Sequence, residues 1–328
     1  MSTTAPSTAG SSQAVPSPAA TASPAPASAA ADGIPAAAVA ADAHGSHTAP
    51  ARLPPARWLS RLPRPSAGTL LAATVLVLAL SWALAPSAFA PGNPLLGQPR
   101  ERLQAPGLAH WFGTDHLGRD VYTRTVHGAA VSLGTTALAV LAAFDIGSAA
   151  GATAATAGGV AESLIMRTVD VAQSIPGLLL SMAVVTALGF GPVAIALAVA
   201  ASSAPAFARI AHGEVLRWRS SLFVEAARLN GVGAVRTVVR HVLPHAAGPV
   251  LALAAVEFGT AILAVSALSF LGYWAPPPQP EWGLLVSEGR DYLASAWWLT
   301  ALPGLAIAAV ALSVNHLARR IGAQRRPA

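Results

Sequence analysis

The sequence contains no cysteine and no lysine among its 328 residues, and each absence excludes a class of site. Without cysteine there is no disulfide and no thiolate metal ligand, which is compatible with either face of a membrane. Without lysine there is no G-x-x-x-x-G-K-[ST] loop, whose lysine reaches the phosphates of a nucleotide. Any ATP hydrolysis linked to this chain must therefore be carried out by a partner.

Charge is also scarce, because charged residues make up 10% of the chain and hydrophobic residues 54%. Soluble domains typically contain about 25% charged residues. This balance predicts an all-α membrane protein. The 20 basic residues are all arginine and lie beside apolar runs, so the net charge of +6 indicates membrane topology rather than nucleic-acid binding.

Residues 1–65 precede the first apolar run. The first 50 are mainly Ala, Pro, Ser and Thr, and four arginines follow them. Few large apolar side chains are available to offset the entropy of ordering such a segment. We expect a disordered cytoplasmic tail.

Six apolar runs are long enough to cross a bilayer, which needs roughly 20 residues. They cover residues 66–90, 130–157, 164–188, 193–211, 246–272 and 299–317. Arginines before the first run and in a basic tail at 321–328 place both termini in the cytoplasm, so residues 91–129 form an external loop. An alternative for the first run is a cleaved signal peptide, because Ala88-Phe89-Ala90 follows its Leu-rich core.

Several residues at the ends of these runs have local structural roles. Pro176 should kink the third span or end its first segment. Arg167 and Asp170 are three residues apart, so we expect them to pair on one helix face. Trp297 and Trp298 lie where an interfacial belt is expected.

Two acidic residues lie deep within predicted spans. Asp145 is in the second span and Glu257 is in the fifth. A charged carboxylate facing lipid costs several kcal/mol. We therefore expect both residues to face the helix bundle, a partner subunit or an aqueous translocation path.

A polar segment of about residues 212–245 separates the fourth and fifth spans. Residues 220–229 are good helix formers, and Asn230-Gly231 favours a helix end or a turn. Valines at i, i+3, i+4 and i+7 then predict a second helix, which stops at Leu243-Pro244. Two short helices meeting at a glycine corner suit docking against another protein, and a solvated loop is the alternative.

Motifs in this segment and elsewhere resemble those of one transporter family. Glu225-Ala226-Ala227, followed by Gly231 and Leu243-Pro244, resembles the EAA loop of ABC-importer permeases. Ahead of the second span, Phe112-Gly113-Thr114-Asp115 and then Gly118-Arg119-Asp120-Val121 resemble a stretch of the dipeptide, oligopeptide and nickel permeases. Further similarities are Met166-Arg167 with Asp170, the end of the fifth span, and Pro280-Glu281-Trp282-Gly283.

The resemblance implies a type I ABC importer permease fold, with a transmembrane domain over residues 130–320, in the bacterial inner membrane. The chain would be a transport subunit without catalytic residues or cofactor, forming the path for peptides, a similar small solute or nickel. Its implied partners are a second homologous permease, two ATP-binding subunits and an extracytoplasmic substrate-binding protein. The residues implied to couple to the ATPase are Glu225, Ala226, Ala227, Arg228, Gly231, Leu243 and Pro244.

The external motif has its own interpretation. Asp115, Gly118, Arg119 and Asp120 predict a folded turn, in which the aspartates cap backbone amides and Arg119 pairs with Asp115 or Asp120. Direct substrate contact is the alternative. Two histidines of this stretch, at positions 110 and 116, are weak evidence for a metal, and none is predicted.

A second functional hypothesis is an ion-driven secondary transporter that uses Asp145 and Glu257. It predicts activity from this chain alone, sensitive to the proton gradient. A membrane-anchored enzyme is disfavoured because no cluster of nucleophile, base and orienting residue is evident.

Overall fold

The computed structural model describes residues 66–222, 224–225, 233, 236, 240, 242–274 and 279–324. These residues all belong to one compact unit, residues 63–328. The predicted tail lies outside the described residues. So does much of the predicted coupling segment, including four of the seven predicted coupling residues: Ala226, Ala227, Arg228 and Gly231.

The secondary structure of the described ranges is helical, with one isolated β-bridge between Thr114 and Asp120. In chain order the elements are α1 (Ala67–Leu84), α2 (Pro86–Phe89), η2 (Pro99–Glu101), α3 (Val121–Ala157), α4 (Gly159–Ser174), α5 (Gly177–Leu188), α6 (Pro192–Arg219), α9 (Leu243–Phe270), α10 (Trp282–Gly289), η4 (Arg290–Tyr292) and α11 (Trp298–Gln324). The predicted all-α membrane fold is confirmed.

Five helices are long and apolar enough to cross a membrane, namely α1, α3, α6, α9 and α11. Helices α4 and α5 meet the same test only as a pair, and they are bent by 101°. Pro176 lies at this break and restricts the preceding Ile175 to an extended conformation, with φ −89° and ψ 131°. The third predicted span, and with it a total of six, therefore exists only if this bent pair counts as one crossing.

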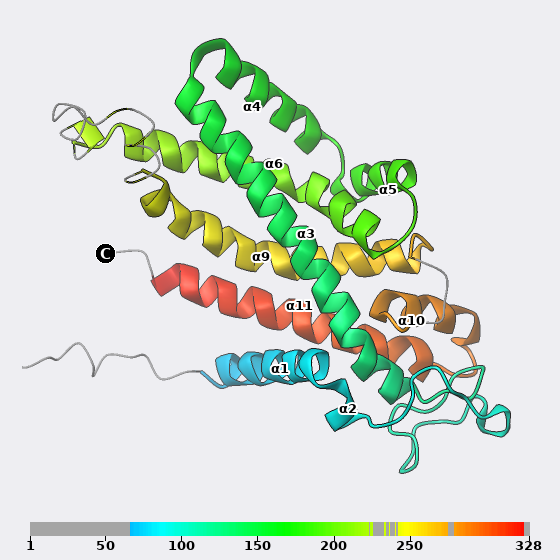
Figure 1. The fold of residues 1–328 in the computed structure, drawn as a ribbon. Coiled ribbons are helices and arrows are strands. Elements are labelled where there is room, and N and C mark those ends of the chain that lie inside the picture. The colour runs from blue at the N-terminus through cyan, green and yellow to red at the C-terminus, as the bar shows by residue number, and fades with distance from the viewer. Residues whose placement is uncertain are drawn as a thin grey trace, which may run out of the picture. The chain divides into compact units, whose positions relative to one another are not determined.

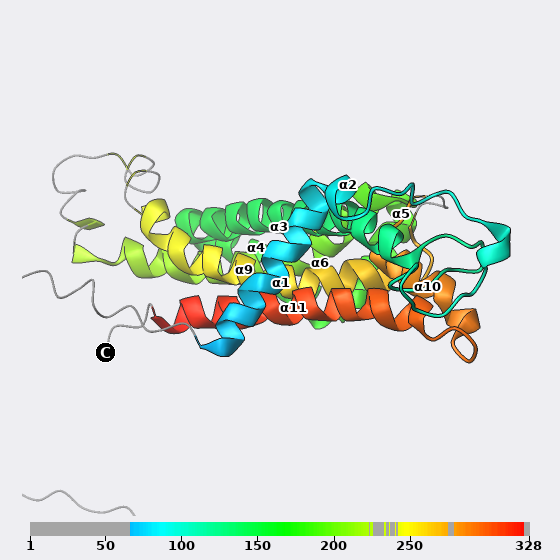
Figure 2. The same ribbon diagram turned by 90° about the horizontal axis from the view of Figure 1, so that it is seen from below.

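Helix α3 is the central element of the bundle. It packs most extensively against α6, while α9 lies between α6 and α11 (Figure 1). Helix α1 lies at the edge of the bundle, against α11 and α3 (Figure 2). Segments from both halves of the chain thus form one packed set of helices.

Glycine allows the close approach of α3 and α6. A Cβ atom on Gly151 would lie 2.1 Å from the carbonyl oxygen of Ala208, and one on Gly147 would lie 2.3 Å from that of Ala204. Any larger residue would force the two backbones apart. Beside these contacts, the rings of Phe144 and Phe207 meet edge to face at 5.9 Å.

Helix α3 begins at residue 121, so the prediction of an external loop over 91–129 was wrong for its last nine residues. Asp120 explains the early start, because its Oδ1 accepts a hydrogen bond of 2.6 Å from the amide of Thr123 and so caps the helix. The first span is also shorter than predicted. It ends at Leu84, because Pro86 has no amide hydrogen to continue the helical hydrogen bonds and instead begins α2.

Two further boundaries differ from the prediction. Helix α6 continues to Arg219, well into the polar segment predicted from about residue 212. Helix α11 continues to Gln324, into the predicted basic tail. Arginine is a good helix former, so a helix need not end where its apolar run ends.

Candidate functional site: the coupling end and the cap end

The coupling end is the region where α6 ends and α9 begins, together with the described residues between them. Arg219 donates to the carbonyl oxygens of Ala155 and Thr156 and so satisfies the last turn of α3. A buried apolar cluster, called here the coupling cluster, adjoins this contact: Ala155, Val215, Val224, Val242 and Ala246. The coupling end therefore joins α3, α6 and α9 to the polar segment.

Aromatic packing reinforces this junction. The rings of Trp218 and His245 lie 4.8 Å apart, and the guanidinium of Arg217 lies 5.3 Å from the centre of the Trp218 ring. Arg217 also pairs with Glu214 at 3.0 Å. The ends of α6 and α9 are thus held against each other by side chains on both.

The predicted coupling residues that the structure describes surround this junction. Glu225 is exposed, and its amide donates to the carbonyl of Ser221 at 3.1 Å, which continues a helical turn beyond α6. Leu243 and Pro244 form the first turn of α9, where a proline is tolerated because its missing amide would have no partner. Pro244 is exposed. Both Glu225 and Pro244 are accessible to another protein.

The cap end lies at the opposite end of α3 and consists of residues 91–120 and α10. A tight turn organises residues 115–119. At its corner Gly118 has φ +76°, and a Cβ there would lie 2.0 Å from the carbonyl oxygen of Gln98. Only glycine fits this position. Trp298 of α11 is buried against the turn and donates to the carbonyl of Thr114 at 3.3 Å, whereas Trp297 is 54% exposed.

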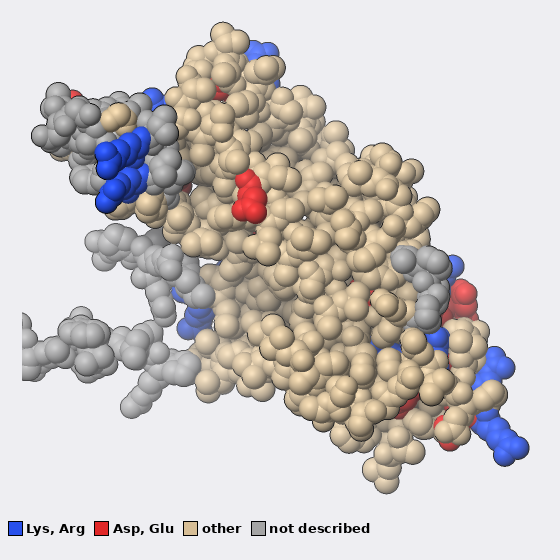
Figure 3. Space-filling view, in the orientation of Figure 1, with Lys and Arg blue, Asp and Glu red and all other residues tan. Residues whose placement is uncertain are grey.

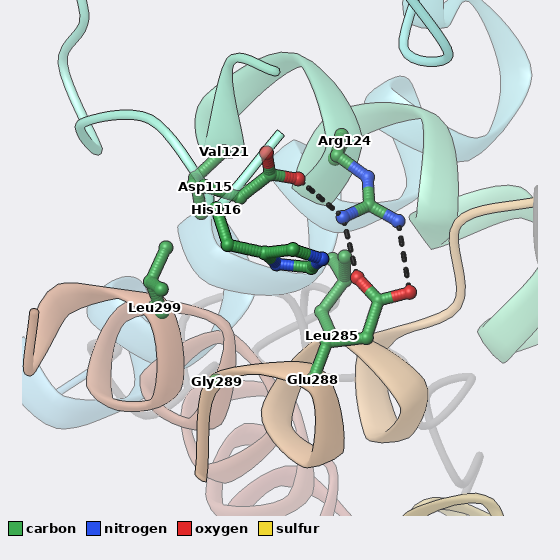
Figure 4. Close-up of a pocket in the computed structure, with 8 residues that line it drawn as sticks. All are labelled: Asp115, His116, Val121, Arg124, Leu285, Glu288, Gly289 and Leu299. Carbon is green, nitrogen blue, oxygen red and sulfur yellow. Dashed lines mark hydrogen bonds and ion pairs between the residues drawn. The ribbon is translucent and has the colours of Figure 1, made fainter. Parts of the chain in front are cut away.

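Four charged residues form the centre of the cap end, called here the charge cluster: Asp115, Arg119 and Arg124, which are buried, and Glu288, which is half-buried. Figure 4 shows three of them, Asp115, Arg124 and Glu288. Asp115 Oδ2 lies 2.6 Å from Arg119 Nε and 2.9 Å from Arg124 Nη1. Arg124 Nη1 also donates to Glu288 Oε2 at 2.6 Å. The cluster carries two charges of each sign and links the cap, α3 and α10.

The electrostatics of Asp115 follow from these contacts. Burial alone would raise the pKa of its carboxyl group, but the amide of Arg119 and the positive charges of Arg119 and Arg124 outweigh that effect. The pKa of Asp115 is therefore lowered below its usual range. Asp115 Oδ1 also accepts from the amides of Leu117 and Arg119, which defines the turn.

A second buried carboxylate fixes α10. Glu281 is fully buried and caps α10 by accepting from the amide of Leu284 at 2.8 Å. It also accepts from Ser132 Oγ of α3 at 3.0 Å, and Ser132 Oγ in turn accepts from the amide of Trp282. Burial raises the pKa of Glu281, although backbone amides and the Ser132 hydroxyl favour its charged form.

The remaining residues of the external motif have separate contacts. Besides capping α3, Asp120 contacts His110, whose Nδ1 lies 2.8 Å from Asp120 Oδ2. His116 instead stacks on Tyr292 at 5.4 Å. Within the described ranges, no group of three or more His, Asp or Glu residues is arranged to hold a metal ion.

The two acids of the spans lie apart from both ends. Asp145 is exposed on α3, and Glu257 of α9 is half-buried, with Oε2 accepting from Thr260 Oγ1 at 3.2 Å. The middle of the face drawn in Figure 3 is almost uncharged. An exposed carboxylate in such surroundings calls for a neighbour outside this chain.

The predicted pair of Arg167 and Asp170 was wrong. Asp170 instead accepts from Arg209 of α6 at 2.6 Å, because α4 folds back along α6 and brings that guanidinium within reach. Glu162 of α4 likewise lies 2.7 Å from His212 of α6. These two contacts join α4 to α6.

Sequence reasoning missed Arg124, Glu288 and Ser132. Arg124 lay in the predicted external loop, where an arginine needs no partner, and only the observed start of α3 at residue 121 places it in a helix. No signal pointed to Glu288, which is 164 residues away in the chain. Ser132 resembles any other small residue of an apolar run.

Comparison with known proteins agrees with this architecture. In a solved structure of the MetNI methionine ABC transporter in an inward-facing conformation, one chain has a similar fold, with a TM-score of 0.50 and 19% identity over 60% of this chain and 94% of that chain. The chain therefore shares the fold of that ABC transporter chain.

Sequence relatives lead to the family. Residues 147–326 match the family described as binding-protein-dependent transport system inner membrane component. A putative peptide transport system permease of Brucella suis is 40% identical over 243 residues, 74% of this chain and 81% of the relative. The dipeptide permease DppC of Alkalihalophilus pseudofirmus is 36% identical over 76% and 80% of the two chains, and the glutathione permease GsiD of Shigella boydii 40% identical over 65% and 70%.

The chain belongs to this family of binding-protein-dependent inner membrane components. It is the permease subunit of a bacterial ABC importer, a multi-pass inner membrane protein that works with ATPase and binding-protein partners.

Proposed function

We propose that this permease forms the path for peptides or a similar small solute, and that the segment between α6 and α9 receives force from a separate ATPase. The cargo is inferred from the relatives, whose names specify peptides, dipeptides and glutathione. Nickel remains a second candidate through the family resemblance. The geometry of the coupling end supports the mechanical part.

The observation that carries the mechanical proposal is the coupling cluster. Val224 and Val242 flank the segment and pack with residues of α3, α6 and α9, and Arg219 ties α6 to the end of α3. A displacement of the segment would therefore move these helices together. Such a rigid-body movement can alternate a path between its two openings when nucleotide binding biases it.

Within this segment the residues have distinct physical roles. Exposed Glu225 would pair with donors on the ATPase. Ala226 and Ala227 would allow a close approach, since larger side chains would hold the other surface away. Gly231 would permit a sharp corner. Arg228, Leu243 and Pro244 complete the proposed contact.

Orientation follows from the distribution of arginine. We place the coupling end and both termini in the cytoplasm and the cap end outside, where a soluble binding protein delivers substrate. A second homologous permease and two ATP-hydrolysing subunits would complete the complex. Asp145, which is exposed on a spanning helix, would face the second permease or the path. Glu257 would line the path.

Reconstitution tests the proposal against an ion-driven transporter. The complete importer in liposomes should accumulate peptide only with ATP and its ATPase subunits, and collapse of the proton gradient should have little effect. Gly231→Val should leave membrane insertion intact and abolish transport and ATPase association. Gly134→Val, on an exposed helix surface with no atom within 4 Å of the added Cβ, is the control. Uptake by the permease alone would refute the proposal.

A further inference from the structure

We propose that the α1 edge of the bundle holds one phospholipid, with an acyl chain between α1 and α11 and an amine-bearing headgroup beside Asp120. Two adjoining cavities support this site, one apolar and one polar. A group of four aromatic side chains centred on Tyr122 lies between them. The site is independent of the cargo and of the ATPase contact.

The apolar cavity is a groove of about 260 Å³ between α1 and α11. That volume is far above the roughly 10–15 Å³ that one water requires. Val75 and Leu78 form one wall and Leu305 and Ala309 the other, while Phe112 of the cap contributes to its lining. Both helices are candidate membrane spans, so the medium at the open side of the groove is lipid hydrocarbon.

A single unsatisfied donor lies in this groove. The indole Nε1 of Trp82 is buried and has no hydrogen-bond partner among the described residues. Burying such a group without a partner costs roughly 1–3 kcal/mol. Trp82 Nε1 is closed off in this conformation, so an ester carbonyl or phosphate oxygen of a lipid would accept from it after a small turn of the indole ring towards the groove. Water is excluded from the hydrocarbon at this depth.

The polar cavity, of about 330 Å³, lies beyond Tyr122. The Tyr122 ring is 6.0 Å from Trp82 and 5.3 Å from Phe112, both of which line the groove, and 5.0 Å from Trp111, which lines the polar cavity. The two cavities therefore adjoin on either side of one ring. A molecule with an apolar chain and a polar head can occupy both.

The lining of the polar cavity selects the charge of the headgroup. Asp120 and His110 line it, and no arginine does. His110 lies between two carboxylates, 2.8 Å from Asp120 and 3.5 Å from Glu101. The three side chains together therefore carry a net negative charge whether the imidazole is neutral or positive. The Trp111 and Tyr122 rings also favour a cation. This chemistry fits the ammonium of an ethanolamine headgroup and opposes an anionic headgroup.

The test uses the complete importer in nanodiscs of phosphatidylethanolamine and phosphatidylglycerol. Each lipid is supplied in turn with a photoactivatable diazirine in one acyl chain, and crosslinked peptides are identified by mass spectrometry. We expect the ethanolamine probe to label residues 75–82 and 302–310, several-fold more than the glycerol probe does. Equal labelling by both probes would overturn the headgroup assignment.

Variants test the two cavities separately. Ala309→Phe fills the groove and should reduce labelling about fivefold or more. Leu312→Phe adds the same ring on an exposed part of α11 outside the groove and should not reduce it. Trp82→Phe keeps an aromatic ring and removes only the donor, so a smaller reduction is expected. Normal labelling of the Ala309→Phe variant in an assembled complex would refute the site.

The headgroup contact has a conservative variant. Asp120→Asn retains an oxygen that can cap α3 but removes the negative charge, so the preference for the ethanolamine probe should fall while total labelling persists. If the groove instead crosslinks to the second permease, a protein and not a lipid covers it, and the proposal fails.

Discussion

The cap end and the coupling end of this permease are stabilised by different interactions. At the cap end, Arg124 is 1% exposed and contacts two carboxylates. Between α4 and α6, towards the coupling end, the pair of Arg209 and Asp170 is 53% and 61% exposed. The coupling end is held instead by small apolar residues and by the packing of Trp218 against His245. Towards the middle of the bundle, α3 and α6 approach closely at Gly147 and Gly151.

This difference shows which of the two ends is stabilised by buried ion pairs within this chain and which leaves residues exposed to a second protein. A buried charge needs a partner of opposite sign, and the charge cluster supplies these partners from this chain alone, although Arg124 Nε has no hydrogen-bond partner among the described residues. At the coupling end, Glu225 and Pro244 are exposed, and the coupling cluster is apolar. We infer that the charge cluster needs no second protein, whereas the coupling end is completed by the ATPase.

The largest expected effect is the loss of Arg124. Arg124→Met removes the closest cation of Glu288 and leaves buried Asp115 and half-buried Glu288 with Arg119 as their one remaining shared partner, which should destabilise the protein by ~3–5 kcal/mol. Thermal unfolding of the purified permease, followed by tryptophan fluorescence, measures this. A decrease in the free energy of unfolding of less than about 1 kcal/mol would show that the stability of the cap end does not depend on the charge cluster.

A bulky side chain at Gly151 should have the next largest effect, near the coupling end. Gly151→Leu collides with the Ala208 carbonyl and should cost ~1–3 kcal/mol or more by forcing α3 and α6 apart. The matched change Gly134→Leu, in the same helix with no neighbour within 4 Å of an added Cβ, should change stability by less than about 0.5 kcal/mol. Equal effects at both positions would contradict the close helix packing.

The pH dependence of the cap end follows from two of its carboxyl groups, whose pKa values are shifted in opposite directions. The pKa of Glu281 is raised, so its contribution to stability is present in acid and is lost as pH rises through the folded-state pKa, by at most ~1.4 kcal/mol per pH unit. The pKa of Asp115 is lowered, so its contribution is present at neutral pH and is lost in acid.

Glu281→Gln checks this sign, because glutamine resembles the protonated acid and does not titrate. Unfolding temperatures measured from mildly acidic to mildly alkaline pH should fall for the natural protein and fall less steeply for the variant. Parallel curves for the two proteins would mean that Glu281 does not titrate in this range.

The smallest expected effect is at the exposed pair. Arg209→Gln should change stability by less than about 1 kcal/mol, because more than half of each side chain of the Arg209–Asp170 pair is exposed and little of the pair is held by packing. The same unfolding assay measures this change. A loss as large as that of Arg124→Met would contradict the contrast between the two ends.

The sequence predicted the helical membrane fold and the break at Pro176, because apolar length and a missing amide act locally. It did not predict that Asp170 pairs with Arg209, since that contact depends on how α4 folds back. It also placed the start of the second span nine residues late, because Tyr122, Thr123 and Arg124 read as polar loop residues. Their helix depends on the Asp120 cap and on burial against α10 and α11.

In the candidate sites, too, the sequence predicted local features but not the contacts between residues far apart in the chain. The Asp115 turn could be anticipated from residues close in sequence, whereas its partners Arg124 and Glu288 come from α3 and α10. The coupling motif was evident as a pattern of Glu, Ala and Gly. The coupling cluster beneath it was not, because Val215 and Ala246 resemble any other apolar residues of a span.

The most direct test of the account uses the natural absence of cysteine. A single cysteine at the coupling end, Glu225→Cys, should form a crosslink with an ATPase subunit of the assembled importer, and nucleotide should change its yield. A single cysteine on the exposed part of the cap, Leu117→Cys, should form none. Crosslinking of the cap to the ATPase, with none from Glu225→Cys, would contradict the account.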